Sequence, residues 1–197
     1  MAYEIEVKAW ITDPVAMRAE LTARAVSIKD YVKEDVYFRA PVVPAPGASS
    51  HPAGGFPPTA AAPQEFRLRR EGGSNVCTFK DKTIRRGVEV NREYEFTVSD
   101  GDAFEALVVR SGCTVFARKR KVGSVFALPE ANVELSHVDG LGDFVEVEKL
   151  VVEDHAATHD AAEQTVRRIL ESLGVEESAI EGRPYTTLIA EKEQGAL

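Results

Sequence analysis

The chain has 197 residues, 44% hydrophobic and 28% charged, which is the composition of a folded globular protein. Its formal net charge of −8 argues against a protein that coats nucleic acid, because binding to a phosphate backbone requires an excess of lysine and arginine over a broad face. No apolar run approaches the roughly 20 residues that span a bilayer. We therefore expect a single domain over residues 1–197, located in the cytoplasm, without a nucleic-acid or membrane partner.

The first forty residues alternate between strand and helix patterns. Residues 2–11 place polar and apolar side chains at alternate positions, which is the period of a half-buried strand. A capped helix with Pro14 in its first turn should follow. Residues 26–39 return to β-branched and aromatic side chains and predict a strand, either whole or broken around Lys33-Glu34.

A segment rich in proline, glycine and alanine interrupts this pattern at about 41–63. Proline removes backbone donors, glycine frees the backbone, and the segment offers no apolar face that could pack. We expect a flexible loop here. Its position between two charged strands leaves open a second interpretation, a lid that becomes ordered over a ligand.

The remainder of the chain is rich in strands. Short strands are expected over 65–71, 75–82, 87–98, 113–121, 123–128, 131–138 and 143–152, with Gly123 marking a turn between two of them. Helices are expected over 99–112, over 155–174 and from Pro184 onward. Many strands joined by tight turns, with few helices, predict an α+β fold: an eight-stranded antiparallel β-barrel with flanking helices.

Charged and apolar side chains occupy opposite faces of six of these strands. The charged faces carry Glu4, Glu6 and Lys8; Arg67 and Arg69; Lys80 and Lys82; Glu93 and Glu95; Lys119 and Lys121; and Glu146 and Glu148. For one strand alone, the ordinary interpretation is a solvated outer surface. For all six together we favour an inner lining, because the helices need an apolar sheet face to cover and because acidic and basic pairs are segregated by strand.

Such a lining would have a defined chemistry. Paired carboxylates are hard oxygen ligands that suit Mg²⁺ or Mn²⁺, and these ions prefer partners such as substrate phosphates. Guanidinium and ammonium groups bind phosphate oxygens, arginine by paired hydrogen bonds and lysine as a point charge. Together these residues predict a site for a metal-complexed polyphosphate that is held by side chains, since the sequence contains no Walker loop and no GxGxxG.

The sequence also resembles a known family, the CYTH domains or triphosphate tunnel metalloenzymes, which include class IV adenylyl cyclases, thiamine triphosphatases and inorganic triphosphatases. Glu4–Lys8 matches the ExExK signature of that family. Further matching blocks follow in order: EDVYF at Glu34–Phe38, FRLRR at Phe66–Arg70, TFK at Thr78–Lys80, REYEF at Arg92–Phe96, KRK at Lys119–Lys121, GLGDFVEVE at Gly140–Glu148 and RPYTTLI at Arg183–Ile189. The GLGDF block and the late Tyr185 are most similar to the class IV adenylyl cyclase branch.

The resemblance implies a barrel whose tunnel binds ATP, inorganic triphosphate or thiamine triphosphate together with Mg²⁺ or Mn²⁺, in a protein that can form a homodimer. It implies metal ligation by Glu4, Glu6, Glu134, Glu146 and Glu148, triphosphate binding by Lys8, Arg67, Arg69, Lys80, Lys82, Lys119 and Lys121, and catalysis by Lys8, Lys80 and Lys119. There is one departure from the family pattern. Ser136 stands where cyclase-like members usually carry an aspartate, so Glu134, on the same face of the strand, is the substitute carboxylate, while His137 should lie on the outer surface.

Three functions follow from this resemblance. The first is a class IV-type adenylyl cyclase, which converts ATP to cyclic AMP and pyrophosphate. The second is a triphosphatase, which releases orthophosphate from a triphosphate. The third, suggested by Ser136, is a non-catalytic binder that senses a polyphosphate or nucleotide.

Overall fold

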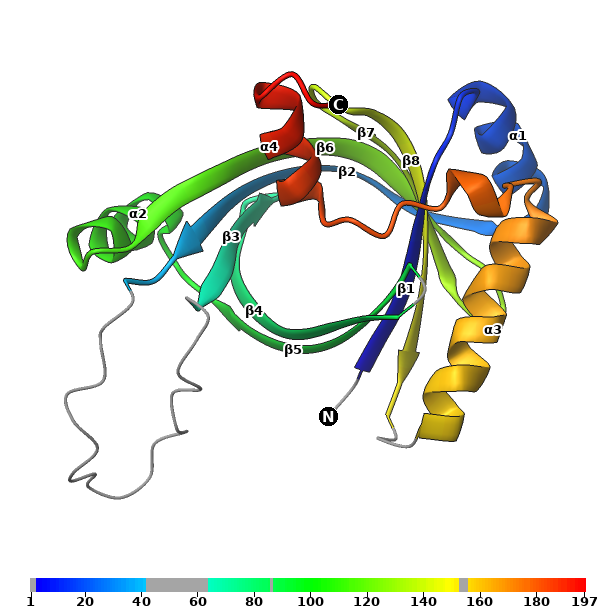
Figure 1. The fold of residues 1–197 in the computed structure, drawn as a ribbon, viewed down its shortest axis with the longest axis horizontal. Helices are drawn as coiled ribbons and strands as arrows, with labels where there is room; N and C mark the ends of the chain where they lie inside the picture. Colours follow the sequence, from blue (N-terminus) through cyan, green and yellow to red (C-terminus); the bar gives the residue numbers. More distant parts are fainter. Residues whose placement is uncertain (1–2, 42–63, 86, 153–155) are drawn as a thin grey trace.

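Eight strands form one closed barrel in the computed structural model of the chain (Figure 1). The structure describes residues 3–41, 64–85, 87–152 and 156–197, without the side chains of 81–83, 85 and 156. Around the barrel the strands follow the order β1-β5-β4-β3-β2-β6-β7-β8, and the neighbouring strands are antiparallel. The predicted eight-stranded antiparallel barrel with flanking helices is confirmed.

The elements have the following bounds. The strands are β1 (Tyr3–Trp10), β2 (Val26–Arg39), β3 (Glu65–Glu71), β4 (Ser74–Arg85), β5 (Val88–Thr97), β6 (Thr114–Ala127), β7 (Asn132–Val138) and β8 (Gly142–Val151). The helices are α1 (Pro14–Arg24), α2 (Gly101–Arg110), α3 (Ala156–Ser172), a short 3₁₀-helix η1 (Glu177–Ala179) and α4 (Tyr185–Glu193). None of the described helices is long and apolar enough to cross a membrane. The flexible loop predicted at about 41–63 lies outside the described residues, apart from its first position.

The helices begin where their capping residues predict. The Asp13 side chain accepts a hydrogen bond from the backbone N–H of Ala16 at 2.9 Å, with Pro14 in the first turn of α1. Asp100 accepts from the N–H groups of Asp102 and Ala103 at the start of α2. These bonds satisfy backbone donors that the first turn of a helix leaves without a partner.

Gly123 corrects one prediction about the strands. The turn expected there is absent, and the two short strands expected on either side are one continuous strand, β6. A Cβ atom at position 123 would lie 2.8 Å from Tyr31 Oη, and closer still to the carbonyl oxygen of Leu135. Atoms of β2 and β7, the strands on either side of β6, thus lie too close to position 123 for a Cβ atom. The glycine is needed for this close approach and not for a turn. The strand from 26 to 39 is likewise unbroken.

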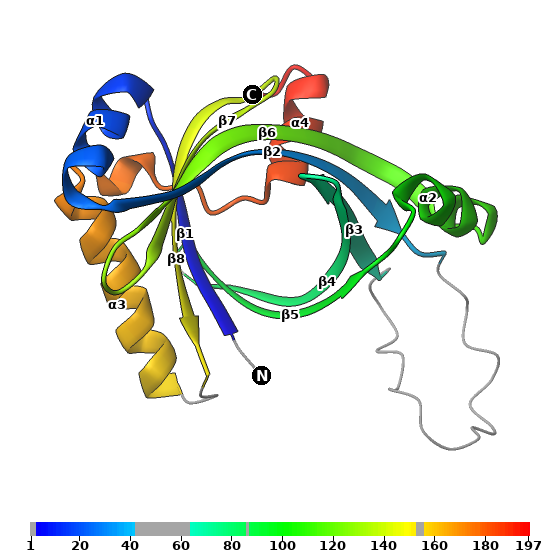
Figure 2. The same ribbon diagram turned by 180° about the vertical axis from the view of Figure 1, so that it is seen from behind.

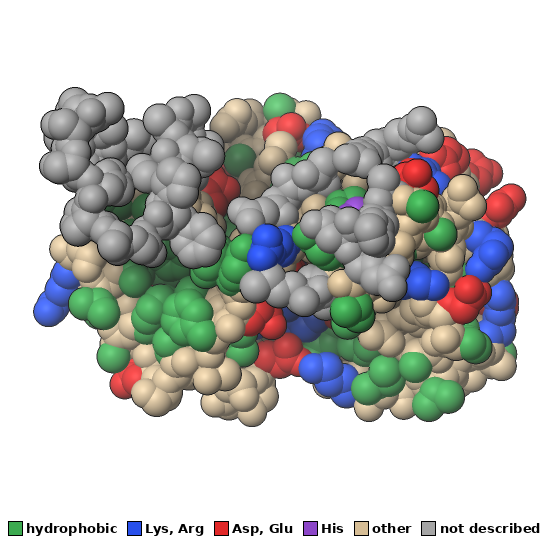
Figure 3. Space-filling view, turned by 90° about the horizontal axis from the view of Figure 1, so that it is seen from below, with side chains coloured by type: hydrophobic (Ala, Val, Ile, Leu, Met, Phe, Trp, Pro, Cys, Tyr) green, Lys and Arg blue, Asp and Glu red, His purple; other side chains and the backbone are tan. Residues whose placement is uncertain are grey.

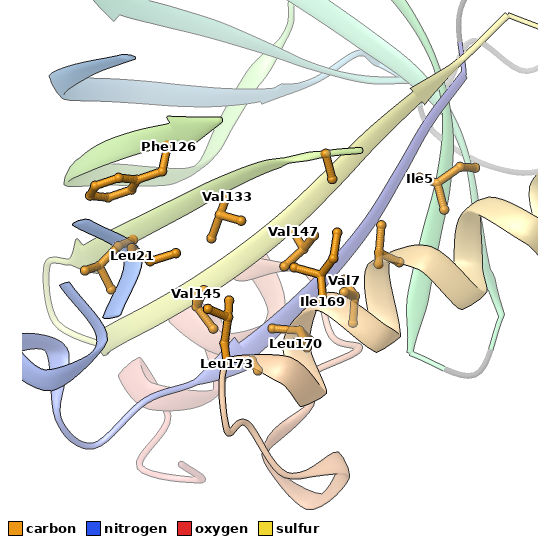
Figure 4. Close-up of a cluster of buried hydrophobic side chains, with 14 of the residues drawn as sticks. Ile5, Val7, Leu21, Phe126, Val133, Val145, Val147, Ile169, Leu170 and Leu173 are labelled. Atoms are coloured by element: carbon orange, nitrogen blue, oxygen red, sulfur yellow. The ribbon is translucent and has the colours of Figure 1, made fainter. Parts of the chain in front are cut away.

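The main hydrophobic core lies outside the barrel, between its wall and two helices (Figure 4). Ile5 and Val7 of β1 are fully buried there, beside Val145 and Val147 of β8. Helix α3 covers these side chains with Val166, Ile169, Leu170 and Leu173, and α1 adds Met17 and Leu21. The apolar face of β1 is thus the outer, helix-covered wall, and its charged face points into the barrel.

Two smaller clusters place the other helices. Helix α2 packs Phe104 and Val108 against Phe38 and Leu68 on the outside of β2 and β3. Helix α4 lies in front of β2 and β6 in Figure 1 and behind them in Figure 2, at one end of the barrel. Its Tyr185 and Leu188 form a buried cluster whose other members are Val138, Phe144, Trp10 and Leu141. Helix α4 therefore contributes to the inside of the barrel, whereas α1, α2 and α3 cover its outside.

Candidate functional site

The barrel encloses a cavity of about 470 Å³ that is lined largely by charged side chains. Eleven of the lining residues belong to the predicted metal and triphosphate sets: Glu4, Glu6, Lys8, Arg67, Arg69, Lys80, Lys119, Lys121, Glu134, Glu146 and Glu148. Lys82 was predicted with them, but its side chain is outside the described part of the structure. The placement of the charged faces is therefore as predicted, while the roles of the individual residues remain predictions.

The outer surface is different in character. On the face seen from below, acidic and basic side chains lie interspersed among hydrophobic ones (Figure 3). His137 is on the outer side of β7, where Nδ1 lies 2.9 Å from Asp143 Oδ1 and more than half of the side chain is exposed. Its predicted surface position is in agreement with this.

Asp35 organises the basic side of the cavity. It lies on β2, is 1% exposed, and accepts two hydrogen bonds from Arg69, at 2.8 and 2.9 Å. Lys119 of β6 lies 3.1 Å from the same carboxylate. Burial alone would raise the pKa of Asp35, but the hydrogen bonds from Arg69 and the charge of Lys119 outweigh burial and hold the pKa far below its usual value. Asp35 therefore stays ionised and orients two cations of the cavity.

Glu134 accepts the most hydrogen bonds among the predicted metal ligands. Its carboxylate accepts from Tyr31 Oη at 2.8 Å, from Lys33 Nζ at 2.6 Å and from Lys121 Nζ at 2.8 Å. Burial raises its pKa, but Lys121 and Lys33 lower it far more, so the group is an anion. These contacts make Glu134 a counter-ion of the buried lysines, and of the proposed metal ligands it has the fewest oxygen lone pairs to spare.

Ser136 does not lie in the cavity lining. It pairs with Phe144 on β8 and Gly123 on β6, and its buried Oγ has no hydrogen-bond partner among the described residues. The carboxylate that stands opposite Glu146 on the neighbouring strand is Glu134. Although Ser136 stands where an aspartate was expected, the carboxylates of Glu134, Glu146 and Glu148 still line the cavity.

Glu6 and Glu148 lie on the acidic side of the cavity, where none of the described side chains forms an ion pair with them. They pair directly across β1 and β8, and no hydrogen bond or ion pair reaches either carboxylate from the described residues. Burial, followed by the charges of Glu146, Glu4 and Glu89, raises the pKa of Glu6 well above its usual value. Burial, followed by Glu4, Glu134 and Glu93, raises the pKa of Glu148 to about 7. Such crowding of negative charge is relieved by a bound cation.

The donor set fits a divalent metal with an incomplete protein shell. Within the described residues, no group of three or more His, Cys, Asp or Glu side chains is arranged to hold a metal ion by itself. Mg²⁺ commonly takes only one or two carboxylates from the protein and completes its shell with water and substrate phosphates. Glu6 and Glu148 could supply these two carboxylates, with Glu4 next to them on β1.

Lys80 lies between the acidic and basic sides. Its ammonium is 3.3 Å from Glu4 Oε1 and forms an ion pair with Glu93. Burial would lower its pKa, but Glu4, Glu93 and Glu6 raise it, so Lys80 is a cation. It therefore offsets part of the negative charge of Glu4 and Glu93.

Several lining residues were not identified from the sequence. They include Lys33, Tyr37, Thr78, Glu89, Tyr185 and Thr186, and also Phe66 and Phe79 from the expected apolar faces of β3 and β4. Lys33 and Tyr37 continue the inward face of β2, and treating 26–39 as one alternating strand would have placed them. Tyr185 arrives from the end of the chain at the start of a helix, where no alternation marks which way it points.

The fold and cavity define a class of protein, a closed antiparallel barrel that holds basic and acidic side chains in a buried tunnel. The chain belongs to the CYTH domain family, whose pattern it matches over residues 2–183. This is a family of enzymes that bind triphosphate substrates and typically use divalent metals. The predicted family resemblance is confirmed.

Individual relatives are distant but span nearly the whole chain. "Adenylate cyclase CyaB" of Aeromonas hydrophila is 24% identical over 193 residues, covering 94% of this chain and 88% of its own. "Putative adenylate cyclase MJ0240" of Methanocaldococcus jannaschii is 24% identical over 186 residues, covering 94% and 97%. The structure of the PH1819 protein from Pyrococcus horikoshii superposes with a TM-score of 0.76 at 23% identity, covering 96% and 99%. HpAC1 from Hippeastrum, described with a dominant triphosphatase activity, has a TM-score of 0.60 at 14% identity, covering 100% and 97%.

Proposed function

We propose that the chain is a divalent-metal-dependent enzyme that acts on a triphosphate held inside the barrel, and that its reaction is the cyclisation of ATP to cyclic AMP and pyrophosphate. One observation carries the proposal. The cavity sets Glu6 and Glu148, which form no ion pair with the described residues, on its acidic side and the arginine and lysine groups oriented by Asp35 on its basic side. A metal-complexed polyphosphate carries the charges that this arrangement would complement.

The residues of the chain would divide the work in the following way. Arg67, Arg69, Lys119 and Lys121 would bind the phosphate oxygens, and Asp35 would keep Arg69 and Lys119 in place. A metal ion held by Glu6 and Glu148 would neutralise phosphate charge when bound. Lys8 and Lys80 would stabilise the negative charge that develops as the bond between the α- and β-phosphates breaks.

In the cyclase reaction the ribose 3′-oxygen attacks the α-phosphorus in line, loses its proton, and pyrophosphate leaves. The names of the relatives from Aeromonas hydrophila and Methanocaldococcus jannaschii support this assignment. A second candidate is a triphosphatase, in which water attacks the terminal phosphorus. The activity described for HpAC1, which shares the fold, supports it. Both reactions would use the same phosphate and metal ligands.

Product analysis separates the candidates. The purified full-length chain is incubated with Mg²⁺ or Mn²⁺ and either ATP or inorganic triphosphate, and the products are resolved by ³¹P NMR and chromatography. Cyclic AMP with pyrophosphate supports the cyclase, orthophosphate supports the triphosphatase, and tight binding without turnover indicates a polyphosphate sensor. Lys80→Ala should reduce binding or turnover, while Arg168→Gln, an exposed change on α3, should leave both unchanged. Absence of both binding and turnover with every substrate and metal would refute the proposal.

A further inference from the structure

Tyr185 lies among three lysines of the cavity. It is the first residue of α4, is 9% exposed, and lines the cavity. The ammonium nitrogens of Lys8, Lys119 and Lys121 lie 4.4, 4.5 and 5.7 Å from the centre of its ring. All three distances are within the roughly 6 Å over which an aromatic ring attracts a cation.

The ring itself is held rigidly. Its hydroxyl donates a hydrogen bond to Glu146, and the rings of Tyr185 and Phe144 form a T-shaped pair with a centroid distance of 4.9 Å and an interplanar angle of 85°. The strand of Lys8 also anchors the segment before α4, because the N–H of Glu181 donates to the Lys8 carbonyl at 2.8 Å. Lys8 Nζ in turn donates to the carbonyl of Arg183 at 2.6 Å.

The ring of Tyr185 contacts the lysines in a way that differs from the carboxylates beside them. Three ammonium groups placed close together repel one another and would move apart unless something held them. Carboxylates already hold two of them, Asp35 beside Lys119 and both Glu134 and Glu146 beside Lys121, and each carboxylate offsets part of the positive charge that would meet a phosphate. The face of an aromatic ring attracts cations through its quadrupole and leaves their charge intact.

We propose that Tyr185 is a positioning residue, whose ring holds Lys8, Lys119 and Lys121 as one charged group directed at phosphate oxygens. The proposal rests on the proposed function of the cavity and adds α4 to the phosphate-binding site. The ring, and not the hydroxyl, is the part that acts on the lysines. Tyr185→Phe keeps the ring and removes the hydrogen bond to Glu146, and Tyr185→Leu removes both.

The binding experiment measures the dissociation constant of inorganic triphosphate with Mg²⁺ by calorimetry. We expect Tyr185→Phe to bind within a few-fold of the wild type and Tyr185→Leu to bind on the order of tenfold or more weakly, as the loss of one to three cation–π contacts implies. Leu188→Ala is the matched control. It shortens a fully buried side chain of the same cluster, and this side chain has no aromatic ring that could attract a lysine. It should lower the melting temperature and leave the dissociation constant unchanged.

A second measurement needs no ligand. The ε-CH₂ protons of Lys8 and Lys119 should show upfield ring-current shifts in the NMR spectra of the wild type and Tyr185→Phe, and these shifts should vanish in Tyr185→Leu. Equal weakening by Tyr185→Phe and Tyr185→Leu would assign the effect to the hydroxyl and overturn the proposal. So would equal weakening by Leu188→Ala, or wild-type affinity in Tyr185→Leu. If the wild type binds no triphosphate although the ring-current shifts are present, the proposed function fails while the placement of the ring stands.

Discussion

Glu6 and Glu148 face each other across two neighbouring strands, and neither carboxylate receives a hydrogen bond or an ion pair from the described residues. They are far apart in the sequence and come together only because β8 closes against β1. Like charges directly opposite each other in a sheet destabilise it, so an unrelieved pair of this kind has a structural cost. A divalent cation removes that cost, which leads to the first prediction.

Glu148→Gln and Glu6→Gln should each weaken Mn²⁺ binding by on the order of tenfold or more, because each removes a charged oxygen ligand. Electron paramagnetic resonance of free Mn²⁺, titrated with protein in the presence of inorganic triphosphate, measures this directly. Glu130→Gln is the matched control, since Glu130 is an exposed glutamate paired with Arg168 on the outer surface. Wild-type affinity in both cavity variants would place the metal elsewhere.

Asp35→Asn should destabilise the fold strongly. The substitution leaves the buried cations Arg69 and Lys119 without their carboxylate, and breaking a buried ion pair typically costs about 3–5 kcal/mol. The control is Asp139→Asn, which breaks an exposed pair with Arg120 and should cost about 1 kcal/mol or less. Urea unfolding followed by circular dichroism gives both values. Similar losses in the two variants would contradict the central role given to Asp35.

Gly123→Ala should also destabilise the protein, by about 1–3 kcal/mol, because the added methyl group meets atoms of β2 and β7. Thermal unfolding monitored by circular dichroism measures the loss. Combining it with Tyr31→Phe removes the clash with the tyrosine hydroxyl but not the clash with the backbone oxygen of Leu135. The double variant should therefore remain less stable than Tyr31→Phe alone, and full recovery would show that the backbone contact is unimportant.

The free energy of unfolding should depend on pH through Glu181, which lies in the segment that leads into α4. Hydrogen bonds from the Arg183 side chain, its backbone N–H and Trp10 outweigh burial and lower the pKa of Glu181 to about 2, from an ordinary value of 4.5. A lowered pKa means that the group stabilises the fold above about 4.5 and loses this contribution as the pH falls toward 2. The difference in unfolding free energy between wild type and Glu181→Gln should thus be largest near neutral pH and should shrink in acid. A difference that does not change with pH would rule out this linkage.

Much of the fold was predictable from the strands taken one at a time. The period of two along β1 and β8 separates Glu6 and Glu148 from Val7 and Val147, and the apolar stripes of the helices indicate which of the two faces is covered. Gly123 shows where such reasoning fails. A glycine between two β-like segments suggests a turn, but the same residue is required wherever two other strands approach too closely for a Cβ atom, and only the packing distinguishes these cases.

The sequence by itself determined which side chains share a face of each strand and that one of these faces is charged, because alternation along a strand is a local property of the backbone. Only the tertiary structure decided which of those charges meet. Closure of the barrel sets Glu6 directly opposite Glu148, surrounds Glu134 with donors from β2 and β6, and brings Tyr185 from the end of the chain onto lysines of β1 and β6. These pairings depend on strand order and helix docking, which are long-range properties that no spacing of residues along the chain records.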